Sequence, residues 1–193
     1  EGCRVMLNGR TEAPLAASCA ELGEGAAYHL ADATDPGACS GLIAATAERW
    51  GGIDVLVCNV GSGASVKPGE ETAAEWQRMF GINFASTTNM VEAARATLAR
   101  SRGAIVCISS ICGVETISGA PLPYAAAKAA LNSYVRGAAR PLGSLGIRIN
   151  AVAPGNILFE GSVWKGKLRQ DTAAVNAMLA NEVALARLGA PAE

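Results

Sequence analysis

The sequence predicts an α/β fold with a doubly wound parallel sheet in a single domain, because short apolar runs alternate with helical stretches along the chain. Each apolar run is followed within two residues by Gly, Asn, Asp, Ser or Pro, which are typical of turns. Half of the 193 residues are hydrophobic and few are aromatic, so small side chains let helices lie close to a sheet. A chain of this length buries roughly 70% of the surface that it exposes when unfolded, which is enough for one core.

The apolar runs are expected to form five strands. The third run, IDVLVC, is apolar on both faces, as is typical of a parallel strand that is covered on both sides. The predicted strands are residues 5–7, 26–31, 53–58, 103–108 and 147–152.

The stretches between and after these runs predict helices. Asp35 and Pro36 supply a capping carboxylate and a proline at the first helical position, and Thr72 and Glu75 have the spacing of a capping box. Strands that alternate with helices of this length form βαβ units, whose right-handed crossovers give a parallel sheet. The predicted helices are residues 11–22, 36–50, 72–100, 124–142 and 171–185, the last of them amphipathic.

The segments that follow the predicted strands give the first indication of a site. The carboxyl ends of parallel strands meet at one edge of a sheet, and ligands bind beyond that edge. We therefore expect five segments to lie together, namely residues 8–10, 32–33, 59–61, 109–110 and 154–155.

Composition argues against several classes of partner. The net charge is −1 and the basic residues are scattered, so we expect no nucleic acid partner. The six cysteines form no CxxC pair and the chain has one histidine, so we expect no metal site and a reduced, cytoplasmic setting. No apolar run reaches about 18 residues, so we expect no membrane-spanning segment.

Tyr124 and Lys128 are the pair of residues that indicates chemistry. They lie four positions apart in a predicted helix, so their side chains share one face. A free phenol has a pKa of about 10, and a nearby ammonium group favours its ionised form. A phenol tuned in this way can protonate a developing alkoxide or deprotonate an alcohol. Taken alone, the pair is equally compatible with a surface lysine beside a half-buried tyrosine.

Five ordered motifs make the chain similar to the short-chain dehydrogenase/reductase family, which has a Rossmann-like fold. The branch that it most resembles contains the 3-oxoacyl-carrier-protein reductases. The resemblance covers essentially the whole chain in register. Its motifs are Cys58-Asn59-Val60-Gly61, Asn83 within Gly-Ile-Asn-Phe, the segment ISSICG that contains Ser110, Tyr124-Ala125-Ala126-Ala127-Lys128, and Ile149-Asn150-Ala151-Val152-Ala153-Pro154-Gly155.

The resemblance implies a catalytic set for hydride transfer between a nicotinamide and a small-molecule carbonyl or alcohol. Tyr124 is expected to be the general acid/base, and Lys128 to lower the tyrosine pKa and to bind the nicotinamide ribose. Ser110 is expected to hydrogen-bond the substrate oxygen, and Asn83 to distort a helix and hold a proton-relay water. The alternatives are a turn hydroxyl for Ser110 and a solvated helix residue for Asn83.

The resemblance also implies a cofactor, and NADP is favoured over NAD. Gly9 occupies the place of the acid that holds a ribose 2′-hydroxyl, and Arg10, which follows it, can accommodate a 2′-phosphate. Asp32 is expected to meet the adenine amino group, and Ala33 to offer its backbone. The alternatives are a solvated loop cation for Arg10 and a turn cap for Asp32.

Two further segments are expected to contact the cofactor. Asn59 and Gly61 match the loop beside the adenosine half, where a glycine lets the backbone approach a ligand closely. The nicotinamide side is matched by Pro154, Gly155 and Ile157. Two residues beyond Ile157, a threonine is often found in the family, and this chain has Phe159 there.

The sequence departs from the family at its ends. The family begins with a strand and a Gly-rich loop that binds the pyrophosphate, and it ends with a helix and a strand that follow residue 191. We therefore expect residues 1–193 to be a partial NAD(P)-binding domain. The alternatives are a truncated, non-catalytic relative that acts as a binding module, and a nucleotide-sugar epimerase or dehydratase. The Ala-rich helices 72–100 and 124–142 resemble the pair through which the family forms homodimers or homotetramers.

Overall fold

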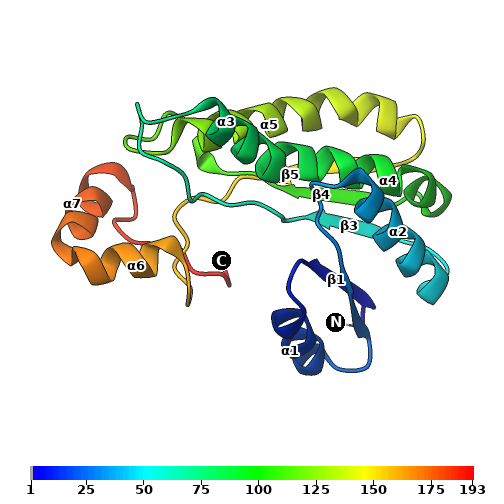
Figure 1. The fold of residues 1–193 in the computed structure, drawn as a ribbon. Helices are drawn as coiled ribbons and strands as arrows, with labels where there is room; N and C mark the ends of the chain where they lie inside the picture. The colour runs from blue at the N-terminus through cyan, green and yellow to red at the C-terminus, as the bar shows by residue number, and fades with distance from the viewer. Residues whose placement is uncertain (1) are drawn as a thin grey trace. The chain divides into compact units, whose positions relative to one another are not determined.

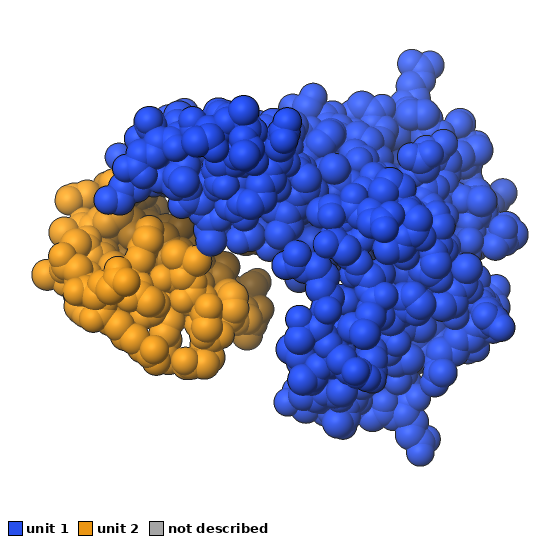
Figure 2. All heavy atoms as spheres, in the orientation of Figure 1, with its two compact units in different colours: residues 1–153 blue, residues 154–193 orange. Residues whose placement is uncertain are grey.

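The computed structural model describes residues 2–193, which form two compact units, residues 2–153 and 154–193 (Figure 2). The elements of the first unit are β1 (Val5–Gly9), α1 (Glu12–Leu22), β2 (Ala26–Leu30), α2 (Pro36–Trp50), β3 (Val55–Cys58), α3 (Ala73–Phe80), a π-helical turn (Gly81–Ala85), α4 (Ser86–Ser101), β4 (Ala104–Ile108), a 3-10 turn (Ile111–Gly113), α5 (Leu122–Gly143) and β5 (Arg148–Val152). The second unit contains α6 (Val163–Gln170) and α7 (Thr172–Glu182).

All five predicted strands are present, with bounds that differ from the prediction by one or two residues. Every strand pair is parallel, which confirms the α/β class with parallel strands (Figure 1). The strands pair as two sheets, β1–β2 and β3–β4–β5. In the described residues β1 and β3 are not paired.

The strand β3 differs from the prediction of a strand covered on both faces. Leu56 and Cys58 are buried, whereas Val55 and Val57 are 58% and 57% exposed. Helices α4 and α5 lie over one face of the β3–β4–β5 sheet (Figure 1). Both faces of β3 are apolar in sequence. In the described residues, helices pack on only one of these faces, so the side chains on the other face are exposed.

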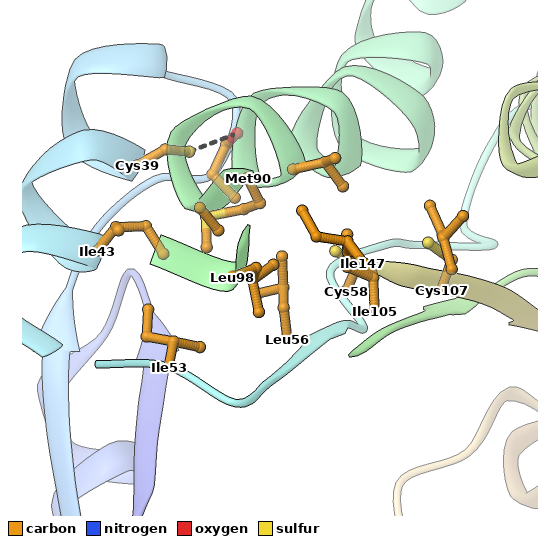
Figure 3. Packing of buried hydrophobic residues seen from close by; sticks show 14 of the residues in the cluster. Cys39, Ile43, Ile53, Leu56, Cys58, Met90, Leu98, Ile105, Cys107 and Ile147 are labelled. Atoms are coloured by element: carbon orange, nitrogen blue, oxygen red, sulfur yellow. Dashed lines mark hydrogen bonds between the residues drawn. The ribbon is translucent and has the colours of Figure 1, made fainter. Parts of the chain in front are cut away.

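The hydrophobic core lies between this sheet and the helices α2, α4 and α5. Leu98 of α4 and Ile105 of β4 are fully buried, and Ile147 joins them immediately before β5 (Figure 3). Cys39, Cys58 and Cys107 belong to the same apolar cluster, where free thiols pack as small hydrophobic groups. This core fixes the carboxyl ends of β3 and β4, after which the site residues follow.

The helix predicted for residues 72–100 is divided by a π-helical turn. Thr72 caps α3 as predicted, and its hydroxyl accepts a hydrogen bond from the Glu75 amide at 3.2 Å. The chain then passes through the π turn Gly81–Ala85 and continues as α4. The turn has Asn83 at its centre, and such turns often mark functional sites.

The second unit contains one helix more than the prediction. Ser162 caps α6, and Asp171 caps α7, which ends before the predicted limit at residue 185. Helix α6 was missed because its sequence, VWKGKLRQ, has a glycine at its centre and no residue that is buried. Within residues 2–193, no helix has both the length and the apolar character that are needed to cross a membrane.

Candidate active site

Tyr124 and Lys128 lie at one cavity of about 180 Å³, one turn apart on α5. The walls of this cavity come from four places, namely the loop after β3, the π turn, the end of β4 and α5. Its lining residues are Asn59, Gly61, Ser62, Gly63, Asn83, Ile108, Ser109, Tyr124 and Lys128. The structure therefore brings Asn59, Gly61 and Asn83 together with the Tyr124–Lys128 pair.

The Lys128 side chain is buried, with 4% of the residue exposed. Its ammonium donates a hydrogen bond to the Ile108 carbonyl oxygen at 2.8 Å and lies 5.9 Å from the centre of the Tyr124 ring. Burial lowers the pKa of Lys128 because the charged form loses its solvation. The alternative of a surface lysine beside Tyr124 is therefore wrong.

The Tyr124 phenol lies near enough to the Ser110 hydroxyl for that group to influence its pKa. Burial raises the pKa of Tyr124 above its ordinary value, and the hydrogen bond with Ser110 opposes this increase. We expected Lys128 to lower the tyrosine pKa. Burial has the largest influence on the phenol, and the lowering of its pKa by Lys128 stays a prediction.

Ser110 follows β4 and begins the 3-10 turn. Its hydroxyl accepts a hydrogen bond from the Cys112 amide at 3.2 Å, so it does serve as a turn hydroxyl as well as facing Tyr124. Gly113, at the end of this turn, contacts the α5 backbone so closely that a Cβ there would lie 2.6 Å from the Lys128 carbonyl carbon. Asn132 of α5 donates to the Gly113 carbonyl oxygen at 3.0 Å. The turn that carries Ser110 is thus fixed to the helix that carries Tyr124.

Asn83 is fully buried, which excludes the alternative of a solvated helix residue. Its amide oxygen accepts from the Ser62 amide at 2.9 Å, and its amide nitrogen donates to the carbonyl oxygens of Ser62 and Met79 at 3.0 and 3.1 Å. A Cβ at Gly61 would lie 2.8 Å from the Asn83 amide oxygen, so only glycine fits there. Asn83 therefore holds the loop after β3 against the π turn. Its expected role with a relay water stays a prediction.

Arg10 and Asp32 lie at the carboxyl ends of the paired strands β1 and β2. The Arg10 guanidinium is 3.8 Å from the Asp32 carboxylate, and both side chains are exposed, at 70% and 41%. Asp32 also accepts from the amide and the hydroxyl of Thr34 at 2.9 and 2.8 Å, and these bonds lower the pKa of its carboxyl. The turn cap considered for Asp32 is therefore present. It leaves the carboxylate at the surface, where a ligand can reach it.

Ala33 is buried, and its carbonyl oxygen is held by Asn89 of α4. The Asn89 amide nitrogen donates to the carbonyl oxygens of Ala33 and Thr34 at 3.1 and 3.2 Å. The sequence did not indicate Asn89, Asn132, Ser62 or Gly63 as site residues. No local pattern marks them, because their partners lie about 20 to 55 positions away in the chain.

Pro154, Gly155 and Ile157 belong to the second unit. Next to Ile157, the Leu158 amide donates to the Gly189 carbonyl oxygen at 2.8 Å, and Ile157 bridges to Gly189. Phe159 is 53% exposed. The contacts that the resemblance implies for these residues stay predictions. Among residues 2–193, no three His, Cys, Asp or Glu side chains converge in a way that would hold a metal ion.

Comparison with known proteins identifies the family. The family model described as enoyl-(acyl carrier protein) reductase matches residues 1–193. The chain belongs to the short-chain dehydrogenase/reductase family. It is 33% identical over 173 residues to the L-fucose dehydrogenase of Oryctolagus cuniculus, an alignment that covers 88% of this chain and 60% of that protein. It is 35% identical over 170 residues to the sorbitol dehydrogenase of Cereibacter sphaeroides, covering 86% of this chain and 64% of that protein. The chain thus spans less than two thirds of these two relatives.

Solved structures of short-chain dehydrogenases/reductases have the same fold. ElxO, solved with NADP bound, superimposes with a TM-score of 0.85 at 25% identity, over 97% of this chain and 76% of that one. The NADH-dependent reductase A1-R′, responsible for alginate metabolism, superimposes with a TM-score of 0.79 at 28% identity, over 96% of this chain and 73% of that one. These likenesses confirm the Rossmann-like fold that the motifs implied.

Proposed function

We propose that this protein is an NADP(H)-dependent oxidoreductase that interconverts a small-molecule carbonyl and alcohol, with Tyr124 as general acid/base. The observation that carries the proposal is the placement of Tyr124 and a buried Lys128 one turn apart at one cavity, with Ser110 directly after the cavity residue Ser109. A phenol and a second hydroxyl that face each other can hold one carbonyl oxygen between them.

The residues at the cavity fit a nicotinamide cofactor. Gly61 has no Cβ, so a ligand can approach its backbone closely at the cavity wall. Lys128 supplies a buried cation beside Tyr124 that can donate hydrogen bonds to ribose hydroxyls. Asn59 is exposed at the mouth of the same cavity. Arg10, Asp32 and the backbone of Ala33 would take the adenosine half. The nicotinamide side would be bounded by Pro154, Gly155 and Ile157.

When bound, the cofactor supplies or accepts the hydride at the substrate carbon. In the direction of reduction, Tyr124 donates its phenolic proton to the substrate oxygen, and the Ser110 hydroxyl donates a hydrogen bond to the same oxygen. The raised pKa of the Tyr124 phenol keeps its proton in place at neutral pH. The ammonium of Lys128 remains near the ring and stabilises the phenolate that is left.

NADP is the proposed cofactor because Arg10 follows the first strand. Its guanidinium is 70% exposed and paired only loosely with Asp32, so a 2′-phosphate can displace the pair at little cost. ElxO, which this chain resembles, was solved with NADP bound. Arg10→Ala should therefore raise the KM for NADPH several-fold and leave the KM for NADH nearly unchanged.

We also propose a homodimer or homotetramer that forms through α4 and α5. A hollow of about 450 Å³ runs between these helices, and its lining is mostly apolar. Close helix contact is favoured there by Gly137 and Ala138. Light scattering on the purified protein should give a mass of two or four chains, and a monomer at micromolar concentration would contradict this.

The test of the function is turnover with a panel of ketones and 3-oxoacyl thioesters, using NADPH and NADH. Consumption of NADPH that depends on a carbonyl substrate supports the proposal. A protein that binds NADPH and turns over no member of the panel would instead support a non-catalytic binding module. Formation of an epimerised or dehydrated nucleotide sugar would instead support a nucleotide-sugar epimerase or dehydratase.

A further inference from the structure

Two charged residues of α3, Glu75 and Arg78, hold the loop after β3 from its outer side. The Arg78 guanidinium donates to the Glu75 carboxylate at 2.7 and 2.6 Å, and one of its nitrogens also donates to the Ala64 carbonyl oxygen at 2.8 Å. The Ser65 hydroxyl donates to the same carboxylate at 2.5 Å. A bidentate arginine–carboxylate pair is well defined in geometry, so it can fix the backbone that it contacts.

The Glu75 carboxylate is almost enclosed by these donors. Its side chain is 13% exposed, against 49% for Arg78. The hydrogen bonds from Arg78 and Ser65 lower its pKa to about 2, so the carboxylate is charged at every pH at which the protein would work. Protonation of Glu75 therefore does not break this network at the pH values at which the protein would work.

The held loop forms the wall of the cavity opposite Tyr124. Asn83 fixes Ser62 from the inner side through two hydrogen bonds. Gly63 lies between the two points of attachment, and a Cβ at Gly63 would be 3.9 Å from the Cζ atom of Tyr124, an ordinary contact distance. The segment nearest to the phenol is thus fastened on both sides, at Ser62 and at Ala64.

We propose that Glu75 and Arg78 are positioning residues that set residues 61–65 against Tyr124 and thereby fix the width of the cavity. The proposal rests on the proposed function of that cavity. Neither residue lines the cavity, so their effect on turnover passes through the loop. A small displacement of this wall changes how the substrate carbonyl meets the phenol, and misplacements of about 1 Å can reduce rates by about 100-fold.

The test compares Glu75→Gln, Arg78→Ala and Arg78→Lys with the wild-type protein. Glu71→Gln is the matched control, because Glu71 also accepts a hydrogen bond from this loop, at Gly69, but does not reach residues 61–65. Two properties are measured, namely hydrogen exchange of the amides in residues 61–66 and kcat and KM with NADPH. Melting temperatures identify any variant that fails to fold. Arg78→Lys keeps the positive charge, so it is the variant expected to fold most like the wild-type protein.

Faster exchange of the loop, with a fall in kcat of about 10- to 100-fold in Glu75→Gln and Arg78→Ala, supports the proposal. Arg78→Lys should behave like Arg78→Ala, because a lysine cannot bind the carboxylate and the Ala64 carbonyl together in the same planar arrangement. Unchanged exchange, or faster exchange with unchanged kcat, would overturn the positioning role. If the wild-type protein has no turnover at all, the proposed function fails separately, and the exchange data alone then decide whether the pair holds the loop.

Discussion

The Lys128 ammonium is hydrogen-bonded at 2.8 Å to the carbonyl oxygen of Ile108, the last residue of β4. Since Ser109 and Ser110 follow Ile108 directly, this bond ties the helix that carries Tyr124 to the segment that carries its hydroxyl partner. Lys128 thus has a structural contact in addition to its proposed electrostatic role.

Replacing Tyr124 by Phe should reduce turnover by about 100- to 10,000-fold, the range that one general acid/base contributes. The ring is retained and only the hydroxyl is lost, so binding of NADPH should change little. Steady-state kinetics and a fluorescence titration with NADPH measure the two effects separately. Turnover close to that of the wild-type protein would remove Tyr124 from its assigned role.

Burial should make Tyr124 ionise above pH 10 in the protein without cofactor. The ionisation is followed by the ultraviolet absorbance of the phenolate as pH is raised. All three tyrosines have raised pKa values, so the titration curve of Tyr124→Phe is subtracted from that of the wild type to isolate Tyr124. A folded-state pKa above the unfolded value of 10.0 means that the contribution of Tyr124 to stability is complete below pH 10 and is lost as pH rises through the folded pKa. A midpoint below 10 would show that Lys128 dominates.

Gly113→Ala should destabilise the protein by about 1–3 kcal/mol, because its Cβ would meet the α5 backbone, which cannot give way as a flexible side chain can. Gly41→Ala is the matched control. Gly41 lies within α2 with nothing inside 4 Å of an added Cβ, so alanine there should stabilise the helix by about 0.5–1 kcal/mol. Urea denaturation measures both, and equal effects would contradict the close contact at Gly113.

Asn83→Ala should cost about 1–3 kcal/mol of stability, because it leaves buried backbone groups of Ser62 and Met79 without their partner. Asn83→Asp should cost more, since a buried carboxylate would face two carbonyl oxygens in place of a donor. Denaturation in urea gives the two values. An aspartate variant as stable as the wild type would show that the side chain is not held as described.

Asn89→Ala should raise the KM for NADPH by about 5- to 150-fold with little change in kcat. Two hydrogen bonds to the segment beside Asp32 are lost, and each contributes about 0.5–1.5 kcal/mol. Thr88→Ala is the neighbouring control, because its hydroxyl bonds only within its own helical stretch, to Ala85. Similar KM values for Asn89→Ala and Thr88→Ala would argue against a role for Asn89 in cofactor binding.

The elements of this fold that depend on local sequence were predictable. The strands follow apolar runs, Thr72 and Asp35 cap helices where their spacing indicates, and the separation of Tyr124 and Lys128 by four positions places both at one cavity. The contacts that complete the site were not predictable in the same way. Lys128 meets a carbonyl 20 positions away, and Asn83 one 21 positions away, so nothing in the neighbouring residues signals either bond.

Two expectations differed from the structure for a common physical reason, which is that sequence patterns do not report burial. The lysine was expected to lower the pKa of Tyr124, whereas burial of the phenol raises it. Both faces of β3 were expected to be covered, and Val55 and Val57 are exposed. In each case the sequence indicated the kind of residue at the position. How far neighbouring elements bury that residue depends on the tertiary fold, which the sequence pattern does not give.

The π turn at Gly81–Ala85 has a consequence for how this region tolerates changes in length. A π-helical turn holds one residue more than an α-helical turn, because its hydrogen bonds run from i to i+5, so deletion of one residue here should convert it into continuous α-helix and leave α4 in its orientation. A second deletion would rotate α4 by about 100°, and the face that bears Val91 and Leu98 would then turn out of the core. The core can therefore accept the loss of one residue from this turn but not of two, whereas the position of Asn83 and its two hydrogen bonds to Ser62 depend on the extra residue.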